Sequence, residues 1–506
     1  MKTKKDNSRD IMKQGFLKSK INMICCIVFV VLISSCSTDF LDVAPDDRID
    51  AAAFFSNPDQ LVFAVNGIYA SQRDIFGDLN FYDLIETRSD NTKNNGQDQK
   101  ERIETDTFEE TSGNLLLIKA WTKNYILINN ANTIISRAPD VSFNNSLEEL
   151  LVTRSIGEAK FLRAMTYFTL VNMFGDLPIR TEPTNDFNNA NMARSSVSDV
   201  YALIVSDLND AISSLPDTYD GGSFNEVGRA TKLAAQTLLG KVQLQQGNKP
   251  EASSALQNII GRYALLTNYA DIHAAGNDSN AESIFDISFN PENQTGLGLN
   301  NFFIPTSVAG SLGIVAGGFA GKLPCNPTQD VLDIYEDGDL RASSSFALYD
   351  NNGSMEPYIS KYIDIAAAAN GSNINLVMLR YADVLLMKAE ADGENAASYE
   401  LINQVRRRAF GKDPSIADFI IDISAASSGT FSEKVMLERR REFLFENHRW
   451  FDLKRLPPSE ALSIINAHLT SEYGDAPTMD AHSLIYPIPQ SEIDISDGLV
   501  TQNPGY

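Results

Sequence analysis

Residues 229–261 carry two apolar stripes at helical spacing, and this pattern constrains the fold more than any other feature of the chain. The stretch reads RATKLAAQTLLGKVQLQQGNKPEASSALQNIIG. Its apolar positions are Ala234, Ala235, Leu238, Leu239 and Val242 in the first half, and Ala252, Ala255, Leu256, Ile259 and Ile260 in the second. Steps of three and four residues place each set on one face of a helix. Gly247 suits a left-handed helix end, and Pro250 suits the first turn of a following helix. We therefore predict two antiparallel helices that resemble a tetratricopeptide unit.

The same periodicity predicts further helices along the chain. A second helical pair is expected in LRYADVLLMKAEADGENAASYELINQVRRRAF, residues 379–410. GEAKFLRAMTYFTLVNMFGDLPI reads as another helix that ends at Gly175. The stripe returns in residues 197–215, where Ser196 and Asp199 are typical of a helix start. The chain is therefore expected to be mostly α, built on a scaffold of helical hairpins.

Two segments break this periodicity. Residues 284–322 read IFDISFNPENQTGLGLNNFFIPTSVAGSLGIVAGGFAGK, a short apolar run followed by a stretch rich in Gly and Asn. Residues 86–102, ETRSDNTKNNGQDQKER, form the second such segment. Long loops without periodicity are usually either functional or disordered. The aromatic residues in the first segment favour a functional loop.

The N-terminal region predicts export and a lipid anchor. Residues 21–33, INMICCIVFVVLI, follow a basic flank and are shorter than the roughly 20 apolar residues that a membrane-spanning helix needs. This arrangement is typical of a secretory signal. Ser34, Ser35 and Cys36 then resemble a bacterial lipobox, in which the cysteine is acylated and becomes the new N-terminus. The alternative is an ordinary signal with a chance cysteine. After cleavage and acylation only Cys325 remains, so no internal disulfide is expected.

The charge balance excludes one class of partner. Residues 1–35 contain seven Lys or Arg and two Asp or Glu, so their removal leaves 35 basic and 64 acidic residues. The remaining chain has a formal charge of about −29, which repels phosphate backbones and anionic lipid. Nucleic acid is therefore not an expected partner, and membrane contact is expected through the acyl chains.

No sequence motif for catalysis or for a cofactor is found. The four histidines, His273, His448, His468 and His482, lie far apart and give no zinc-ligand spacing. DIYEDGDLR, residues 333–341, has a partial likeness to a calcium loop, but Tyr335 and Ser344 occupy liganding places, which favours a solvated turn. We expect no metal and no cofactor. A glycoside hydrolase needs two carboxylates about 5–9.5 Å apart, and the sequence neither places nor excludes such a pair.

Residues 437–455, LERRREFLFENHRWFDLKR, contain the densest run of charge. Arg439, Arg440 and Arg441 lie beside Glu438, Glu442 and Glu446, and the pairs Glu438–Arg441 and Arg439–Glu442 are three residues apart. Such spacing predicts ion pairs along the helix. The segment is therefore interpreted as a structural helix rather than a binding patch.

This segment, followed by PIPQSEIDISDGLVTQNPGY at the end of the chain, resembles the SusD/RagB-like outer-membrane nutrient-binding lipoproteins. The motifs LRYADVLLMKAEA, INQVRRRA, GEAKFLRAMTYFTLVNMFGDLPI and CSTDFLDVAP resemble that family in the same order. The resemblance extends from Cys36 to Tyr506. It implies a surface-exposed, lipid-anchored protein of the cell outer membrane, which captures oligosaccharides without catalysis. The partner it implies is a SusC-like TonB-dependent transporter, over which the protein lies as a lid.

The resemblance also implies a division of the chain. Tetratricopeptide-like hairpins support a loop-rich ligand-binding subdomain with few short strands, as in the SusD-like fold. The expected parts are a signal peptide (1–35), a lipidated tether (36–50), a helical N-terminal part (51–283), a loop-rich ligand-face insertion (284–375) and a C-terminal SusD/RagB part (376–506).

By the same resemblance, the ligand face uses residues 81–101 and 289–321. A sugar site offers aromatic planes to C–H faces and polar side chains to hydroxyls. Trp121 and Trp450 occupy framework motifs, so the stacking role is expected to fall to Tyr and Phe. The candidate ligand-binding residues are Tyr82, Arg88, Asp90, Asn94, Phe289, Asn290, Asn301, Phe302, Phe303 and Phe319.

Two alternatives to glycan capture remain open from the sequence. One is a lipoprotein of the same transporter type that captures peptide or acts as a scaffold. An exposed strand edge or an apolar groove would favour peptide. The other alternative is a surface glycoside hydrolase, which the absence of catalytic motifs disfavours.

Overall fold

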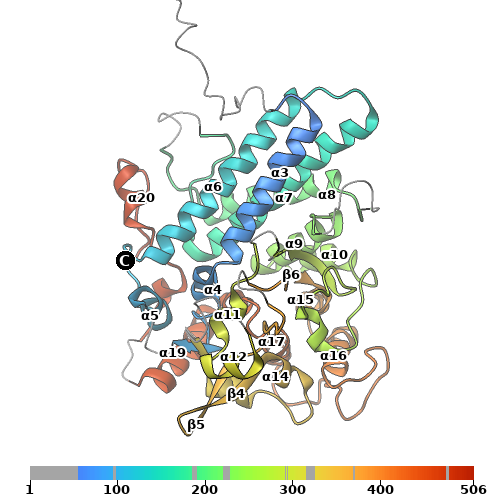
Figure 1. Ribbon diagram of the computed structural model, residues 1–506, viewed down its shortest axis with the longest axis vertical. Coiled ribbons are helices and arrows are strands. Elements are labelled where there is room, and N and C mark those ends of the chain that lie inside the picture. Colours follow the sequence, from blue (N-terminus) through green and yellow to red (C-terminus); the bar gives the residue numbers. More distant parts are fainter. Residues whose placement is uncertain are drawn as a thin grey trace, which may run out of the picture. The chain divides into compact units, whose positions relative to one another are not determined.

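A computed structural model describes residues 55–94, 99–184, 191–219, 228–290, 292, 295–314, 325–367, 371–474 and 478–506 (Figure 1). Residues Asn57–Tyr506 form one compact unit. The predicted lipidation site Cys36 and the candidate Phe319 lie outside the described residues.

The N-terminal half is built from long helices that pack on one central helix. This helix is α7 (Ser146–Phe174), which contacts α3 (Pro58–Phe76), α6 (Leu115–Arg137) and α8 (Val197–Ser214) (Figure 1). Every residue from 161 to 174 is buried, including Arg163, which is paired with Asp207 of α8. The predicted helix end at Gly175 and the predicted cap Ser196 are confirmed: Gly175 has φ +74°, and the Ser196 hydroxyl accepts from the Asp199 amide.

Both predicted hairpins are confirmed. The first consists of α9 (Lys232–Gln245) and α10 (Lys249–Gln257), and the second of α15 (Tyr381–Asp392) and α16 (Ala396–Ala409). A Cβ atom at Gly240 would lie 2.6 Å from the Leu256 side chain, so the first hairpin closes only with glycine there. α10 also contacts α15, so the two hairpins stack as neighbouring repeats do.

The remaining elements are short. The strands form three antiparallel pairs: β1 (Thr92–Asn94) with β3 (Cys325–Pro327), β2 (Ser283–Ile287) with β6 (Leu376–Arg380), and β4 (Phe346–Asn351) with β5 (Ser354–Ile359). The short helices are α4 (Leu79–Ile85), α5 (Lys100–Thr107), α11 (Leu299–Phe303), α12 (Thr306–Leu312), α13 (Gln329–Asp333) and α14 (Leu340–Ser345). Three single turns of 3-10 helix are η2 (Ala138–Asp140), η4 (Tyr269–His273) and η6 (Ala481–Leu484).

The C-terminal part adds α17 (Phe431–Glu442), α18 (Arg449–Arg455), α19 (Pro458–Tyr473) and α20 (Gln490–Ile495). A reciprocal capping box of Thr430 and Glu433 begins α17. Within the described ranges, no helix is long and apolar enough to cross a bilayer.

Candidate ligand-binding face

The two loop segments predicted to form a ligand face lie side by side. β1, in the first segment, pairs with β3, which follows the second segment, with Lys93 opposite Asn326. The ring centroids of Tyr82 and Phe303 are 4.8 Å apart, so the segments also pack through side chains. A fold that joins residues this distant in the chain creates one continuous face from both loops.

The aromatic residues of this face differ in exposure. Tyr82 and Phe303 are buried, and the Phe303 ring lies 6.4 Å from that of Tyr362. Phe302 is half-buried, and a Cβ atom at Gly298 would lie 3.3 Å from its ring edge. Of these rings, Phe302 is therefore the one with surface to offer a ligand. Trp121 and Trp450 are buried, as predicted.

Arg88 is the best enclosed of the predicted polar candidates. Its Nη1 donates to Glu110 Oε1 at 2.7 Å, and its Nη2 donates to the Ser483 carbonyl at 2.7 Å. The guanidinium carbon lies 3.8 Å from the ring centroid of Tyr486 and 4.4 Å from that of Phe108. Arg88 is fully buried, so as placed it anchors the loop and presents no surface to a ligand.

Asp90 is also buried. Its two carboxylate oxygens accept from Arg449 at 2.7 and 2.8 Å, and Arg440 Nη2 lies 3.1 Å from Oδ2. Burial alone raises the pKa of Asp90, but the charges of Arg440 and Arg449 outweigh it and hold that pKa below its ordinary value. Asp90 is therefore ionised, and its side chain is occupied by protein groups.

The remaining candidates differ in burial and in hydrogen bonding. The backbone amide of Asn94 donates to Asp106 Oδ2 at 2.6 Å, and Asn94 is buried. Phe289 is buried, and its ring covers Gly77. Asn290 is exposed and pairs through its backbone with Thr295 in both directions. The backbone of Asn301 is in α11, but its side chain lies outside the described ones. Ligand contact by all ten candidates stays a prediction.

The ion pairs of α17 were predicted along the helix, and that prediction is wrong. Among the described residues, Arg439, Arg440 and Arg441 pair with carboxylates of other segments, not with Glu438, Glu442 or Glu446. The reason is burial: most of these side chains are enclosed, so each reaches the neighbouring segment packed against it. The interpretation of the segment as structural is confirmed.

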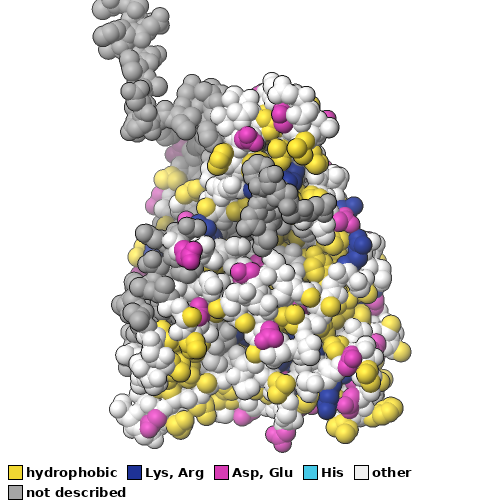
Figure 2. Space-filling view, turned by 45° about the vertical axis from the view of Figure 1, so that its right-hand side comes forward, with side chains coloured by type: hydrophobic (Ala, Val, Ile, Leu, Met, Phe, Trp, Pro, Cys, Tyr) yellow, Lys and Arg dark blue, Asp and Glu magenta, His cyan; other side chains and the backbone are white. Residues whose placement is uncertain are grey.

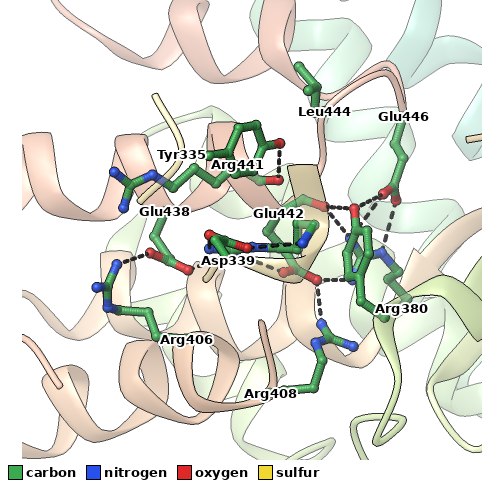
Figure 3. A network of polar contacts seen from close by, with 12 residues as sticks. Tyr335, Asp339, Arg380, Arg406, Arg408, Glu438, Arg441, Glu442, Leu444 and Glu446 are labelled. Carbon is green, nitrogen blue, oxygen red and sulfur yellow. Dashed lines mark hydrogen bonds and ion pairs between the residues drawn. The ribbon is translucent and has the colours of Figure 1, made fainter. Parts of the chain in front are cut away.

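Glu442 of α17 lies in a dense network of buried ion pairs (Figure 3). Its carboxylate lies 2.5 Å from Arg380 and 3.1 Å from Arg341, and it also pairs with Arg408. Burial raises the pKa of Glu442, and the three guanidinium groups reverse that effect and lower it. These partners come from β6, α14 and α16, so a single carboxylate ties three elements to α17.

The network reaches the ligand face through Arg440. Its Nε donates to Asn91 Oδ1 at 2.9 Å, and its Nη1 lies 2.5 Å from Asp330 of α13. Asn91 in turn donates to Glu86 Oε1 at 2.8 Å. Burial raises the pKa of Glu86 to about 7. α17 thus fixes both strands of the face, β1 through Asn91 and β3 through the segment that follows it.

In the described ranges, no group of three His, Cys, Asp or Glu side chains could hold a metal ion. In the partial calcium-loop sequence, Asp339 is buried and Arg341 Nη2 lies 2.6 Å from its carboxylate. The interpretation of this residue as part of a solvated turn is therefore wrong, because the adjacent arginine folds back onto it.

On the face shown in Figure 2, acidic and basic side chains are scattered among uncharged and hydrophobic ones. The negative net charge of −24 is therefore not gathered into one patch on that face.

Comparison with known proteins identifies relatives over most of the chain. The model of the "SusD family" matches residues 341–506, and a model described as "Starch-binding associating with outer membrane" matches residues 39–244. A SusD-like protein of Formosa agariphila is 27% identical over 504 residues, covering 85% of this chain and 89% of the relative. The starch-binding protein SusD of Bacteroides thetaiotaomicron is 27% identical over 178 residues, or 34% of this chain and 30% of the relative.

The fold is shared with solved structures. A "Laminarin binding SusD-like protein" superimposes with a TM-score of 0.73 and 24% identity, covering 89% of this chain and 100% of that one. This likeness shows the fold, a mostly helical scaffold with few short strands, and confirms the fold class predicted from the sequence.

Proposed function

Because the chain belongs to the SusD/RagB-like family, we propose that it is a lipid-anchored surface protein that binds glycans without cleaving them. It hands the bound oligosaccharide to a SusC-like TonB-dependent transporter of the outer membrane, over which it acts as a lid.

Relatives support the glycan as ligand class. One is named a starch-binding protein and another a laminarin-binding protein. The description of the matching N-terminal family model refers to starch binding and to association with the outer membrane. These names do not decide which glycan this chain takes, because ligand identity depends on the site rather than on the fold.

The observation that carries the proposal is the junction of the two loops. The pairing of β1 with β3 and the packing of Tyr82 on Phe303 hold the two loops together. Phe302, next to Phe303 in the chain, is half-buried, and Asn290 is exposed. A partly exposed ring suits the apolar C–H face of a sugar, and an exposed amide such as that of Asn290 suits its hydroxyls.

The engagement of three carboxylates on the described part of the face supports the non-catalytic part of the proposal. A glycosidase needs one carboxylic acid and one carboxylate that both reach the glycosidic bond. Asp90 is occupied by two arginines, Asp106 accepts from the Asn94 amide, and Asp83 lies 2.7 Å from Arg102 Nε. All three are buried, which supports binding without hydrolysis.

A binding screen tests the function. Soluble protein beginning at Ser37 is passed over immobilised laminarin, starch, xylan, mannan and pectin, and over tryptic peptides of casein. Saturable retention on a polysaccharide without new reducing ends is the expected result. New reducing ends would establish a hydrolase instead, and retention on peptides alone would establish the peptide-capturing alternative.

The anchor and the partner are tested in cells. Replacing Cys36 with Ala should release the folded protein from the membrane fraction, and continued anchoring would contradict lipidation at Cys36. Gentle extraction of the unmodified protein should bring a TonB-dependent transporter with it, and its absence would contradict the lid role.

A further inference from the structure

A cavity of about 630 Å³ lies against the outer face of α3, and no residue of 81–101 or 289–321 lines it. Its opposite wall consists of Gly228, Arg229 and residues 286–288, at the end of β2. None of the ten predicted ligand residues lines it. Its volume lies within the range of about 300–1,000 Å³ that small-molecule sites occupy.

One stripe of α3 forms the floor of the cavity. Asp59, Phe63, Asn66, Tyr69 and Arg73 follow one another at steps of three and four residues, and all line the cavity. The opposite face of α3 is buried, because α3 packs against α6 and α7. Helical geometry therefore leaves this polar and aromatic stripe facing the cavity.

The far side of the cavity is fixed by hydrogen bonds. Arg229 Nη1 donates to the buried Glu158 at 2.7 Å, and Nη2 donates to Asn66 Oδ1. The Tyr69 hydroxyl accepts from the Ala230 amide at 2.9 Å, and Arg229 lies 5.7 Å from the centroid of the Tyr69 ring. The wall is therefore preorganised and does not need to be ordered by a ligand.

Three other residues at the cavity, Phe63, Arg73 and Asp59, leave their side chains available to a ligand. The Phe63 side chain is 68% exposed. Among the described residues, the guanidinium of Arg73 and the carboxylate of Asp59 have no hydrogen-bond or ion partner. A single exposed Phe on a helix is ordinary. Here the exposed ring lies beside a cavity together with an unpaired donor group and an unpaired acceptor group.

We propose that this cavity is a second oligosaccharide-binding site, in which one sugar ring stacks on Phe63 and the hydroxyls of successive rings along α3 are bound by Asp59, Asn66 and Arg73. The proposal rests on glycan capture as the function of the chain. The lining selects the ligand class: an exposed ring and hydrogen-bonding groups spread along α3 suit a chain of sugar rings, each with an apolar C–H face and hydroxyls at its edge. A second site would raise the avidity for a long polysaccharide that reaches both.

The test uses protein from Ser37 to Tyr506 and oligosaccharides of six sugars prepared from whichever of laminarin, starch, xylan, mannan and pectin is retained. Calorimetric titration is run on the unmodified protein, Phe302→Ala, Phe63→Ala and Arg73→Ala. Phe419→Ala and Arg137→Ala are matched controls, because both side chains are exposed and outside either site.

Two binding events are expected in the unmodified protein. Phe63→Ala and Arg73→Ala should each weaken one event about tenfold and leave the other, which Phe302→Ala weakens. A single event that Phe63→Ala and Arg73→Ala leave unchanged would overturn the second site while glycan capture stands. Casein peptides that bind in a manner dependent on Phe63 would overturn the ligand class. No retention on any polysaccharide would overturn both proposals.

Discussion

Arg449 holds Asp90 with two parallel hydrogen bonds, from Nε to Oδ1 at 2.7 Å and from Nη2 to Oδ2 at 2.8 Å. The two residues are 359 positions apart in the chain. A guanidinium in the C-terminal motif therefore holds a side chain of the first of the two loops in place. This relationship explains how a buried segment dense in charge supports the conformation of a loop distant in the chain.

Removing this carboxylate should be costly. Asp90→Ala leaves Arg449 buried without its carboxylate partner, whereas Arg440 keeps Asp330, and breaking a buried pair from one side typically costs about 3–5 kcal/mol. Urea denaturation followed by circular dichroism measures the loss. Asp217→Ala is the matched control. Asp217 pairs with Arg262 at 2.8 Å, and both side chains are about half exposed. The expected loss in free energy of unfolding is therefore below about 1 kcal/mol. Equal losses in the two variants would contradict the anchoring role of Asp90.

Stability should depend on pH through Asp106. Burial raises the pKa of Asp106 to about 7, although the Tyr473 hydroxyl and the Asn94 amide donate to its carboxylate. A carboxyl group whose pKa is raised on folding stabilises the fold below its unfolded pKa of about 4, and that contribution is lost as pH rises towards 7.

Asp106→Asn should therefore remove part of the stability loss between pH 5 and pH 8, by about 1–3 kcal/mol relative to the unmodified protein. Urea denaturation at both pH values gives the difference, in which contributions of other groups cancel. Asp140→Asn, an exposed site, should keep the unmodified profile. A profile of Asp106→Asn that matches the unmodified protein would contradict the raised pKa.

Neighbouring phenylalanines in α11 should behave differently. Phe303 is 1% exposed and packs on Tyr82, so Phe303→Ala should lower the free energy of unfolding by about 3–5 kcal/mol. Phe302 is half-buried, and its replacement should cost less than half of that. Thermal unfolding of both variants checks the order. The reverse order would show that Phe302, not Phe303, supports the junction of the loops.

Gly371 should be required where the second loop returns to the scaffold. It has φ +102°, and a Cβ atom there would lie 2.7 Å from the Leu297 carbonyl oxygen. The next residue, Ser372, exchanges two backbone hydrogen bonds with Leu297, at 2.7 and 3.0 Å. Gly371→Ala should break this bridge and speed amide hydrogen exchange at Leu297 by tenfold or more. Gly353→Ala, in an open turn with similar φ, is the control for backbone strain alone.

The helical framework was predictable because its signals are local. The stripes of α9 and α10 repeat every three or four residues, and Gly247 has the left-handed conformation, φ +78°, that a helix stop suggests. The short helices α11 and α12 were missed, because five and seven residues are too few to show a period.

The place of the polar candidates in the chain was predictable from the sequence, but their burial and their partners were not. The sequence placed Arg88 and Asp90 in the irregular segment of residues 86–102, yet their partners Glu110 and Arg449 follow 22 and 359 residues later. Nothing local indicates that such a partner will enclose the side chain. The stripe on α3 was missed for a related reason: its polar side looks like an ordinary solvated face until the fold places β2 opposite.

The most direct test of the central claim is calorimetric titration of the retained oligosaccharide into the unmodified protein and into Phe302→Ala, with thermal unfolding of both. We expect Phe302→Ala to weaken binding at the loop face about tenfold while it keeps nearly the unmodified melting temperature. Unchanged affinity in a folded Phe302→Ala protein would contradict the assignment of the joined loops as the glycan-binding face.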